Sequence, residues 1–271
     1  MSWNEFEMSV ANGRPVEFYE FSRDDTRFYR YTNADRDMAF NGYTWEAAAI
    51  QCPGVTVGTS DGLEITVPAT NPVALMFRGA PPSSSVRLRV FRNQADDTSG
   101  DYRIVWVGTV TEAKREATDR VKLITNSIAS TFTRNGLRLT WGRNCPYSLY
   151  DHNCRVDKTK FAATSLTVLA LDGASLTIAL PGSLPDGWFS GGFIEWTVDG
   201  LTERRGLKGQ NGNTIGIFGG TAGFSVGQVV TLYPGCDRII NTCSSKFNNH
   251  LNYGGQPQMP GVSPFGIIKL F

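Results

Sequence analysis

The stretch Pro15-Val16-Glu17-Phe18-Tyr19-Glu20-Phe21, the turn Ser22-Arg23-Asp24-Asp25 and the run Thr26-Arg27-Phe28-Tyr29-Arg30-Tyr31 decide the fold class of this chain. Both outer runs are rich in aromatic and β-branched residues, which favour strands. The four residues between them are polar and typical of a turn. The stretch therefore predicts two antiparallel strands at the start of a β-rich protein.

The same pattern continues through the first half of the chain. Phe40-Asn41-Gly42-Tyr43-Thr44-Trp45 predicts a hairpin, because Asn-Gly accepts the positive φ angles of a type I′ turn. A short helix is expected over 71–78, with Asn71 as its cap and Pro72 at its first position. Further strands are predicted over 62–68, 85–91, 103–110 and 120–125. These elements make up a predicted N-terminal domain, residues 1–135.

The second half, residues 136–271, is predicted to form a second domain. Short apolar runs separated by glycine-rich turns predict a β block at about 164–232. Its strands are expected over 165–171, 175–180, 192–198, 201–207, 214–218 and 228–232. A short helix is expected over 244–252, after the block.

Composition excludes several classes of protein. The 271 residues contain 26 Lys and Arg against 25 Asp and Glu, so there is no large positive footprint for nucleic acid. The polar start Met1-Ser2-Trp3-Asn4-Glu5 does not have the pattern of a signal peptide, and no apolar run approaches the roughly 20 residues needed to span a bilayer. We expect a protein with no membrane anchor, made in a reducing cytoplasm.

Four of the five cysteines form two bracketed pairs. Cys145 and Cys154 have eight residues between them, and Cys236 and Cys243 have six. Four thiolates that converge are the ligand set of a tetrahedral zinc ion or an iron–sulfur cluster. These spacings are wider than the two to four residues usual between the cysteines of a structural zinc site, so they suit an iron–sulfur cluster better than a single ion. Zinc and two local disulfides remain open alternatives. Cys52 is expected to be an unligated, buried thiol.

Two other types of site remain open from the sequence. Cys154 with His152, or Cys243 with His250, could form the nucleophile and base of a peptidase, but no orienting acid is indicated. A glycan-binding module is a third reading, because tryptophans can form sugar platforms. The tryptophans in question are Trp45, Trp106, Trp188 and Trp196.

Motifs in both halves of the chain carry a resemblance to a known family. In the C-terminal half they are Tyr233-Pro234-Gly235-Cys236-Asp237, Thr242-Cys243, Lys246-Phe247-Asn248-Asn249, Asn252-Tyr253-Gly254-Gly255, Pro257 and Pro260-Gly261. In the N-terminal half they are Tyr31-Thr32-Asn33-Ala34-Asp35-Arg36-Asp37, Phe40-Asn41-Gly42-Tyr43-Thr44-Trp45 and Ala49-Ile50. The chain resembles the phage BR0599 family, which includes tail-tip hub proteins of siphophages and gene transfer agents. The resemblance is weakest over 165–230. The spacing within each cysteine pair is also similar to that of the lambda-type minor tail protein L.

The resemblance implies a mainly β fold. Its N-terminal domain would be a tail-tube-like β-sandwich or barrel, and its C-terminal domain would hold a cysteine cluster and a second small β-barrel block. The resemblance further implies that Cys145, Cys154, Cys236 and Cys243 hold a [4Fe-4S] cluster as cofactor. The stretch between the two pairs is longer here than in the lambda type.

The function implied by the resemblance is structural and not enzymatic. The chain would be a minor tail (hub) protein of a virion or tail-like particle. It would form a homotrimer between the distal tail ring above and the central tip or fibre protein below. DNA would pass through its lumen without sequence-specific binding. A tail-tip cell-wall peptidase and a zinc-stapled glycan-binding module are the alternatives.

Overall fold

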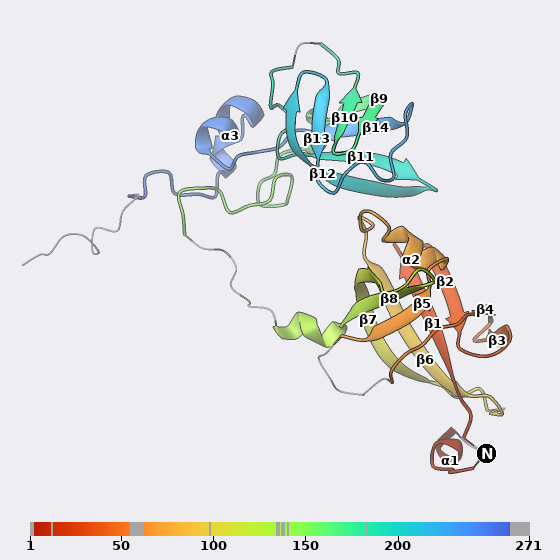
Figure 1. Cartoon of the computed structure of the whole chain (residues 1–271). Coiled ribbons are helices and arrows are strands. Elements are labelled where there is room, and N and C mark those ends of the chain that lie inside the picture. Colours follow the sequence, from red (N-terminus) through yellow and green to blue (C-terminus); the bar gives the residue numbers. More distant parts are fainter. Residues whose placement is uncertain are drawn as a thin grey trace, which may run out of the picture. The chain divides into compact units, whose positions relative to one another are not determined.

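The computed structural model describes residues 3–11, 13–54, 62–97, 99–133, 136, 139, 141–182 and 184–260. The chain divides into two compact units, Met1–Arg134 and Asn135–Phe271, each with its own hydrophobic core. Both units are built mainly from β-strands (Figure 1), which confirms the fold class expected from the sequence. No helix among the residues described is long and apolar enough to cross a membrane.

The first unit contains one eight-stranded sheet with the order β3-β4-β2-β1-β6-β7-β8-β5. Neighbouring strands are antiparallel except β2 and β4, which are parallel. The predicted strands are confirmed, and their bounds are β1 (Pro15–Arg23), β2 (Arg27–Thr32), β3 (Met38–Phe40), β4 (Tyr43–Ala47), β5 (Glu64–Pro68), β6 (Val86–Gln94), β7 (Arg103–Arg115) and β8 (Arg120–Ser127). Helix α1 (Trp3–Glu7) precedes the sheet and the 3₁₀ helix η1 (Ile128–Thr133) follows it.

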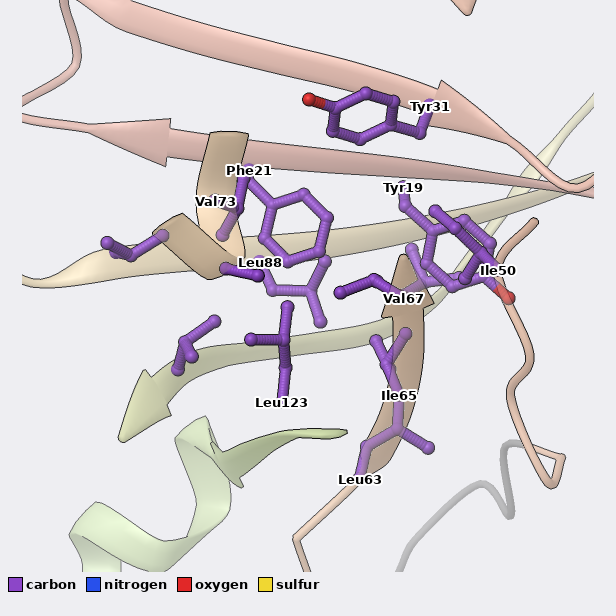
Figure 2. Packing of buried hydrophobic residues seen from close by; sticks show 14 of the residues in the cluster. Tyr19, Phe21, Tyr31, Ile50, Leu63, Ile65, Val67, Val73, Leu88 and Leu123 are labelled. Atoms are coloured by element: carbon purple, nitrogen blue, oxygen red, sulfur yellow. The ribbon is translucent and has the colours of Figure 1, made fainter. Parts of the chain in front are cut away.

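This sheet curls around its own core. Side chains alternate between the two faces of a strand, so Tyr19 of β1 points into the core and is fully buried. Tyr31 of β2 and Ile65 of β5 come from distant parts of the strand order but pack in the same cluster (Figure 2). Two main-chain hydrogen bonds between Gln51 and Thr66, each 2.9 Å long, join the segment after β4 to β5. The sheet is therefore close to a barrel.

A second, aromatic cluster covers the other face of β1. Phe18 stacks on Phe40 with ring centroids 4.2 Å apart, and Trp45 packs edge-on against Phe18. The Trp45 indole N–H donates to the carbonyl oxygen of Phe40 at 2.9 Å. The β3–β4 hairpin that brings these rings together turns at Asn41 and Gly42, whose φ angles are 49° and 76°. The predicted type I′ hairpin is confirmed.

Helix α2 (Pro72–Met76) closes one side of the first core. The Asn71 side chain accepts a hydrogen bond of 2.9 Å from the main-chain N–H of Val73, and Pro72 occupies the first turn, as the sequence predicted. Val73 is completely buried in the core. The helix ends two residues earlier than expected, because the chain leaves helical geometry at Phe77.

Six strands of the second unit close into a barrel with the order β10-β13-β12-β11-β14-β9. The ring closes because β9 pairs antiparallel with both β10 and β14. Alternate residues, such as Leu166 and Val168 of β9, fill its interior. The second β-barrel block expected from the sequence is confirmed. Its strands are β9 (Ala163–Asp172), β10 (Ser175–Ile178), β11 (Phe193–Val198), β12 (Leu201–Asn211), β13 (Thr214–Ile217) and β14 (Val229–Tyr233).

The segments that flank the barrel in sequence, 141–162 and 234–260, come together beside it. They carry the 3₁₀ helices η2 (Lys158–Lys160) and η3 (His250–Asn252) and the helix α3 (Ile240–Phe247), which Figure 1 shows next to the barrel. Cys154, Val156 and Phe247 form a small buried cluster between the two segments. This cluster places both cysteine pairs in one region of the second unit.

Candidate metal centre

Four cysteine side chains line one cavity of about 240 Å³ in the second unit. They are Cys145 and Cys154 from the first flanking segment and Cys236 and Cys243 from the second. All four are free thiols, so neither local disulfide is formed in this structure. Within the described part of the chain, no three His, Cys, Asp or Glu side chains gather closely enough to hold a single metal ion. The thiols surround a space and do not meet at one point.

Cys52, the fifth cysteine, belongs to the first unit. Its half-buried side chain packs against the core of that unit. Burial raises the pKa of its thiol, as expected for a structural cysteine in apolar surroundings.

The loop of the first pair is organised by Asp151. One carboxylate oxygen of this residue accepts from the main-chain N–H groups of Asn153 and Cys154, at 2.9 and 2.6 Å. The other accepts from the N–H of Ser148 at 3.2 Å. These bonds close the chain into a compact turn that directs Cys154 to the cavity. This role of Asp151 is not predicted from the sequence, although an aspartate between Cys145 and Cys154 is typical of a turn.

The segment before Cys236 lies directly against another stretch of backbone. A Cβ atom added to Gly235 would lie 2.0 Å from the carbonyl oxygen of Ser190, and one added to Gly192 would lie 2.0 Å from that of Tyr233. No side chain fits in either place. Glycine in the Tyr-Pro-Gly-Cys motif is therefore needed for close backbone packing between the second pair and the turn that leads into β11.

The helix near the second pair begins earlier than the sequence indicated. It was predicted over 244–252, but α3 spans Ile240–Phe247, so Cys243 lies inside it. Just before this start, the Asp237 carboxylate accepts from the N–H of Ile239 at 2.9 Å and from the hydroxyl of Thr242 at 2.7 Å, although no side chain caps the first turn of the helix itself. Asn248 ends the helix in the left-handed conformation, with φ of 49°.

The Asn-Tyr-Gly-Gly motif joins the C-terminal segment to the first pair. The Tyr253 hydroxyl donates to the carbonyl oxygens of Arg143 at 2.7 Å and Arg238 at 3.0 Å. A Cβ atom at Gly254 would come within 2.3 Å of the Tyr147 ring. The motif thus packs against residues next to both Cys145 and Cys236.

Two further side chains attach this region to the barrel. The Tyr150 hydroxyl donates to the carbonyl oxygen of Pro234 at 2.7 Å. The Lys246 ammonium group donates to the carbonyl oxygens of Trp188 and Gly235, at 2.5 and 2.9 Å. Neither role is predicted from the sequence, although Lys246 lies in the Lys-Phe-Asn-Asn motif.

The thiols influence one another electrostatically. Burial raises the pKa of Cys236 and raises that of Cys243 to about 11. The charges of Cys154 and Cys145 raise both values further, since like charges oppose ionisation. Without a positive centre Cys236 and Cys243 therefore stay protonated at neutral pH. Bound metal ions would supply that charge and convert them to thiolate ligands.

The histidines and tryptophans of the alternative sites are not among the residues that line the cavity. His152 and His250 are exposed, and no hydrogen bond joins either histidine to a cysteine in the described ranges. Of the tryptophans considered for glycan binding, Trp45, Trp106 and Trp196 are at most 7% exposed and belong to hydrophobic clusters. Trp188 is partly covered, with the Lys246 ammonium group 4.6 Å from its ring centroid.

Two family models match separate parts of the chain, and the first extends past the boundary between the two units. A family model described as "Baseplate hub protein, N-terminal attachment domain" matches residues 16–157, more than half of the chain. A second, described as "Phage conserved hypothetical protein BR0599", matches residues 187–262. An uncharacterized protein of Xylella fastidiosa (strain 9a5c) is 27% identical over an aligned length of 133 residues, and the match covers 44% of this chain and 27% of that protein. The match thus spans about a quarter of the length of this curated relative.

Among solved structures, a chain of the "Virion of native gene transfer agent (GTA) particle" has a similar fold. The TM-score is 0.74 at 20% sequence identity, over 96% of this chain and 93% of the other. At that identity the likeness concerns the fold, and it extends over both units. The resemblance read from the sequence motifs is confirmed by the two family models. The chain belongs to the family of phage baseplate hub proteins.

Proposed function

We propose that this hub protein holds a [4Fe-4S] cluster through Cys145, Cys154, Cys236 and Cys243, and that the cluster has a structural role. The observation that carries the proposal is that all four cysteines line one cavity of about 240 Å³. The two pairs are separated by 81 residues, which include the whole barrel. A centre that joins them would pin both ends of the barrel block.

The donor set fits the proposed group. Iron–sulfur cubanes are commonly held by four cysteine thiolates, and the four cysteines here are free. The cavity is several times the volume of roughly 30 Å³ that one water molecule occupies in the liquid, so it has room for a group of several atoms. When bound, the cluster would supply four iron–thiolate bonds. The chain itself supplies the preformed loops that present the ligands.

A structural role is favoured over a catalytic one. Both histidines are exposed, and the hydrogen-bonding groups around the cavity are mostly main-chain atoms that fix loop geometry. These features support a hub that is not an enzyme, and they argue against the Cys–His peptidase.

The partners proposed for the hub follow from its family. The matched attachment domain supports a role in joining other tail proteins. We infer a homotrimer that connects the distal tail ring to the central tip or fibre protein, with a lumen that DNA crosses without sequence-specific binding. Native mass spectrometry of the purified full chain tests the trimer, and a monomer at micromolar concentration would contradict it.

The cluster is tested by anaerobic purification followed by iron, sulfide and zinc analysis. We expect about four iron and four sulfide per chain, the stoichiometry of a cubane. Serine at any one of the four ligand positions is expected to lower the iron content strongly, whereas the matched control Cys52→Ser keeps it. Zinc without sulfide would establish the zinc alternative. Iron retained in all four serine variants would contradict the ligand assignment.

A further inference from the structure

Asn249 contacts both cysteine pairs. Its main-chain N–H donates to the carbonyl oxygen of Cys243 at 3.0 Å, which places Asn249 at the end of α3. Its side-chain amide donates to the carbonyl oxygen of Cys154 at 2.6 Å, across a sequence separation of 95 residues. The same amide nitrogen lies 3.9 Å from Cys154 Sγ. One residue therefore connects the main chain of a cysteine in the second pair to that of a cysteine in the first.

The orientation of this amide follows from its partners. The Cys154 carbonyl can only accept, so the Asn249 NH₂ group must face it. The Asn249 carbonyl oxygen in turn accepts from the side-chain NH₂ of Asn252 at 2.7 Å. The chain of donors from Asn252 through Asn249 to Cys154 leaves only one consistent arrangement. This arrangement also gives a role to Asn249 of the Lys-Phe-Asn-Asn motif and to Asn252 of the Asn-Tyr-Gly-Gly motif, neither of which is a proposed ligand.

The backbone places Asn249 where it can make both contacts. Asn248 adopts the left-handed conformation with φ of 49°, which turns the chain at the end of α3. Asn249 is half-buried and lines the cavity together with Asn252. A buried amide without its partners would be destabilising, so the pair of bonds restrains the segment in this position.

We propose that Asn249 is a positioning residue that holds Cys154 in register with α3 and directs an N–H toward its sulfur. The first role concerns the protein's own loops and applies with or without a bound group. The second role rests on the proposed cluster, since hydrogen bonds to the cysteine sulfurs raise the reduction potential of iron–sulfur centres.

The first role is tested on the full chain in its metal-free form. The measurement is the rate at which Cys154 reacts with iodoacetamide, read by peptide mass spectrometry, with Cys52 as the internal reference. Asn249→Ala is expected to speed the reaction roughly tenfold, because the loop opens more often once its hydrogen bond is lost. The matched control is Asn241→Ala, an exposed asparagine in the first turn of α3 that does not line the cavity. Equal Cys154 rates in these two variants would overturn the proposal.

Asn252→Ala keeps the test decisive if Asn249→Ala does not fold. It removes only the donor that orients Asn249, and we expect a change in the same direction of roughly threefold. A rate equal to that of the Asn241→Ala control would overturn the proposal in this case as well.

The second role is tested on anaerobically purified protein by a redox titration followed by electron paramagnetic resonance. Asn249→Ala should shift the reduction potential to more negative values than Asn241→Ala does, and Asn249→Asp should shift it further, since a carboxylate replaces the donor. An unshifted potential in both variants would overturn the sulfur contact. A wild-type protein without iron would overturn the cluster of the proposed function, while the metal-free experiment would still decide the coupling.

Discussion

The Tyr150 hydroxyl donates a hydrogen bond of 2.7 Å to the carbonyl oxygen of Pro234, 84 residues further along the chain. Tyr150 belongs to the loop of the first cysteine pair, and Pro234 directly follows the last barrel strand. The Tyr150 ring also packs edge-on against Phe193 and Tyr233. The first pair is thus attached to the barrel by one side chain, with no metal involved.

Tyr150→Phe should therefore loosen the second unit while leaving the ring packing intact. We expect the free energy of unfolding to fall by about 1–2 kcal/mol, because the Pro234 carbonyl loses its hydrogen-bond donor in a partly buried place. Urea denaturation followed by tryptophan fluorescence measures the change. Tyr43→Phe, in the half-exposed hairpin of the first unit, is the matched control. Equal stability of the two variants would contradict the role given to Tyr150.

Gly235→Ala should damage the cysteine site through steric overlap. The added Cβ would lie 2.0 Å from the Ser190 carbonyl oxygen, so the backbone before Cys236 must move. We expect a loss of about 2–4 kcal/mol in stability together with a lower iron content. Gly142→Ala is the control, since a Cβ there meets nothing within 4 Å. A Gly235→Ala protein as stable as this control would show that the close approach is not required.

The metal-free protein should have an unusually unreactive thiol at Cys243. Burial and the neighbouring thiols raise its pKa to about 11, whereas an unfolded cysteine ionises near roughly 8.5. At pH 8.5 the thiolate fraction is then about 100-fold smaller than in an unfolded chain, and alkylation should be slower by a similar factor. Peptide mass spectrometry after timed iodoacetamide exposure measures the rate. A rate like that of a model peptide would contradict the burial effect.

The same shift in pKa has a consequence for stability. The folded-state pKa of Cys243 is raised, so its contribution to stability is complete below roughly pH 8.5 and is lost as the pH rises toward about 11. We expect the melting temperature of the metal-free second unit to fall across this window. Cys243→Ser should flatten the pH dependence. An unchanged pH dependence in that variant would assign the effect to other groups.

Trp45→Ala should destabilise the first unit by about 3–5 kcal/mol, the usual cost of removing a large buried aromatic side chain. Trp45 is 1% exposed and packs against Phe18, Phe40 and Phe91. Trp141→Ala is the control, because that side chain is 82% exposed. Thermal unfolding by circular dichroism measures both variants. Similar melting temperatures would mean that the aromatic cluster is not essential to the unit.

Much of the fold could be predicted because its signals are local. Two kinds of signal act over a few residues and need no distant partner to be recognised. They are the alternation of apolar and polar residues in 15–31 and 85–91, and the Asn41-Gly42 turn. The predicted start of α3 was wrong although the contacts there are local too. Asp237 accepts from Ile239 and Thr242, two and five residues further along, and an aspartate in such a place indicates a turn as readily as the approach to a helix.

The sequence by itself determined the β class, the strand positions and the identity of the four candidate ligands, because residue types and short spacings carry that information. Only the tertiary structure decided that Cys145 and Cys154 line the same cavity as Cys236 and Cys243, and that Asn249 connects the two pairs. These contacts depend on closure of the barrel between the pairs, which brings its two ends together. No pattern within either segment encodes that closure, since it arises from the pairing of β9 with both β10 and β14.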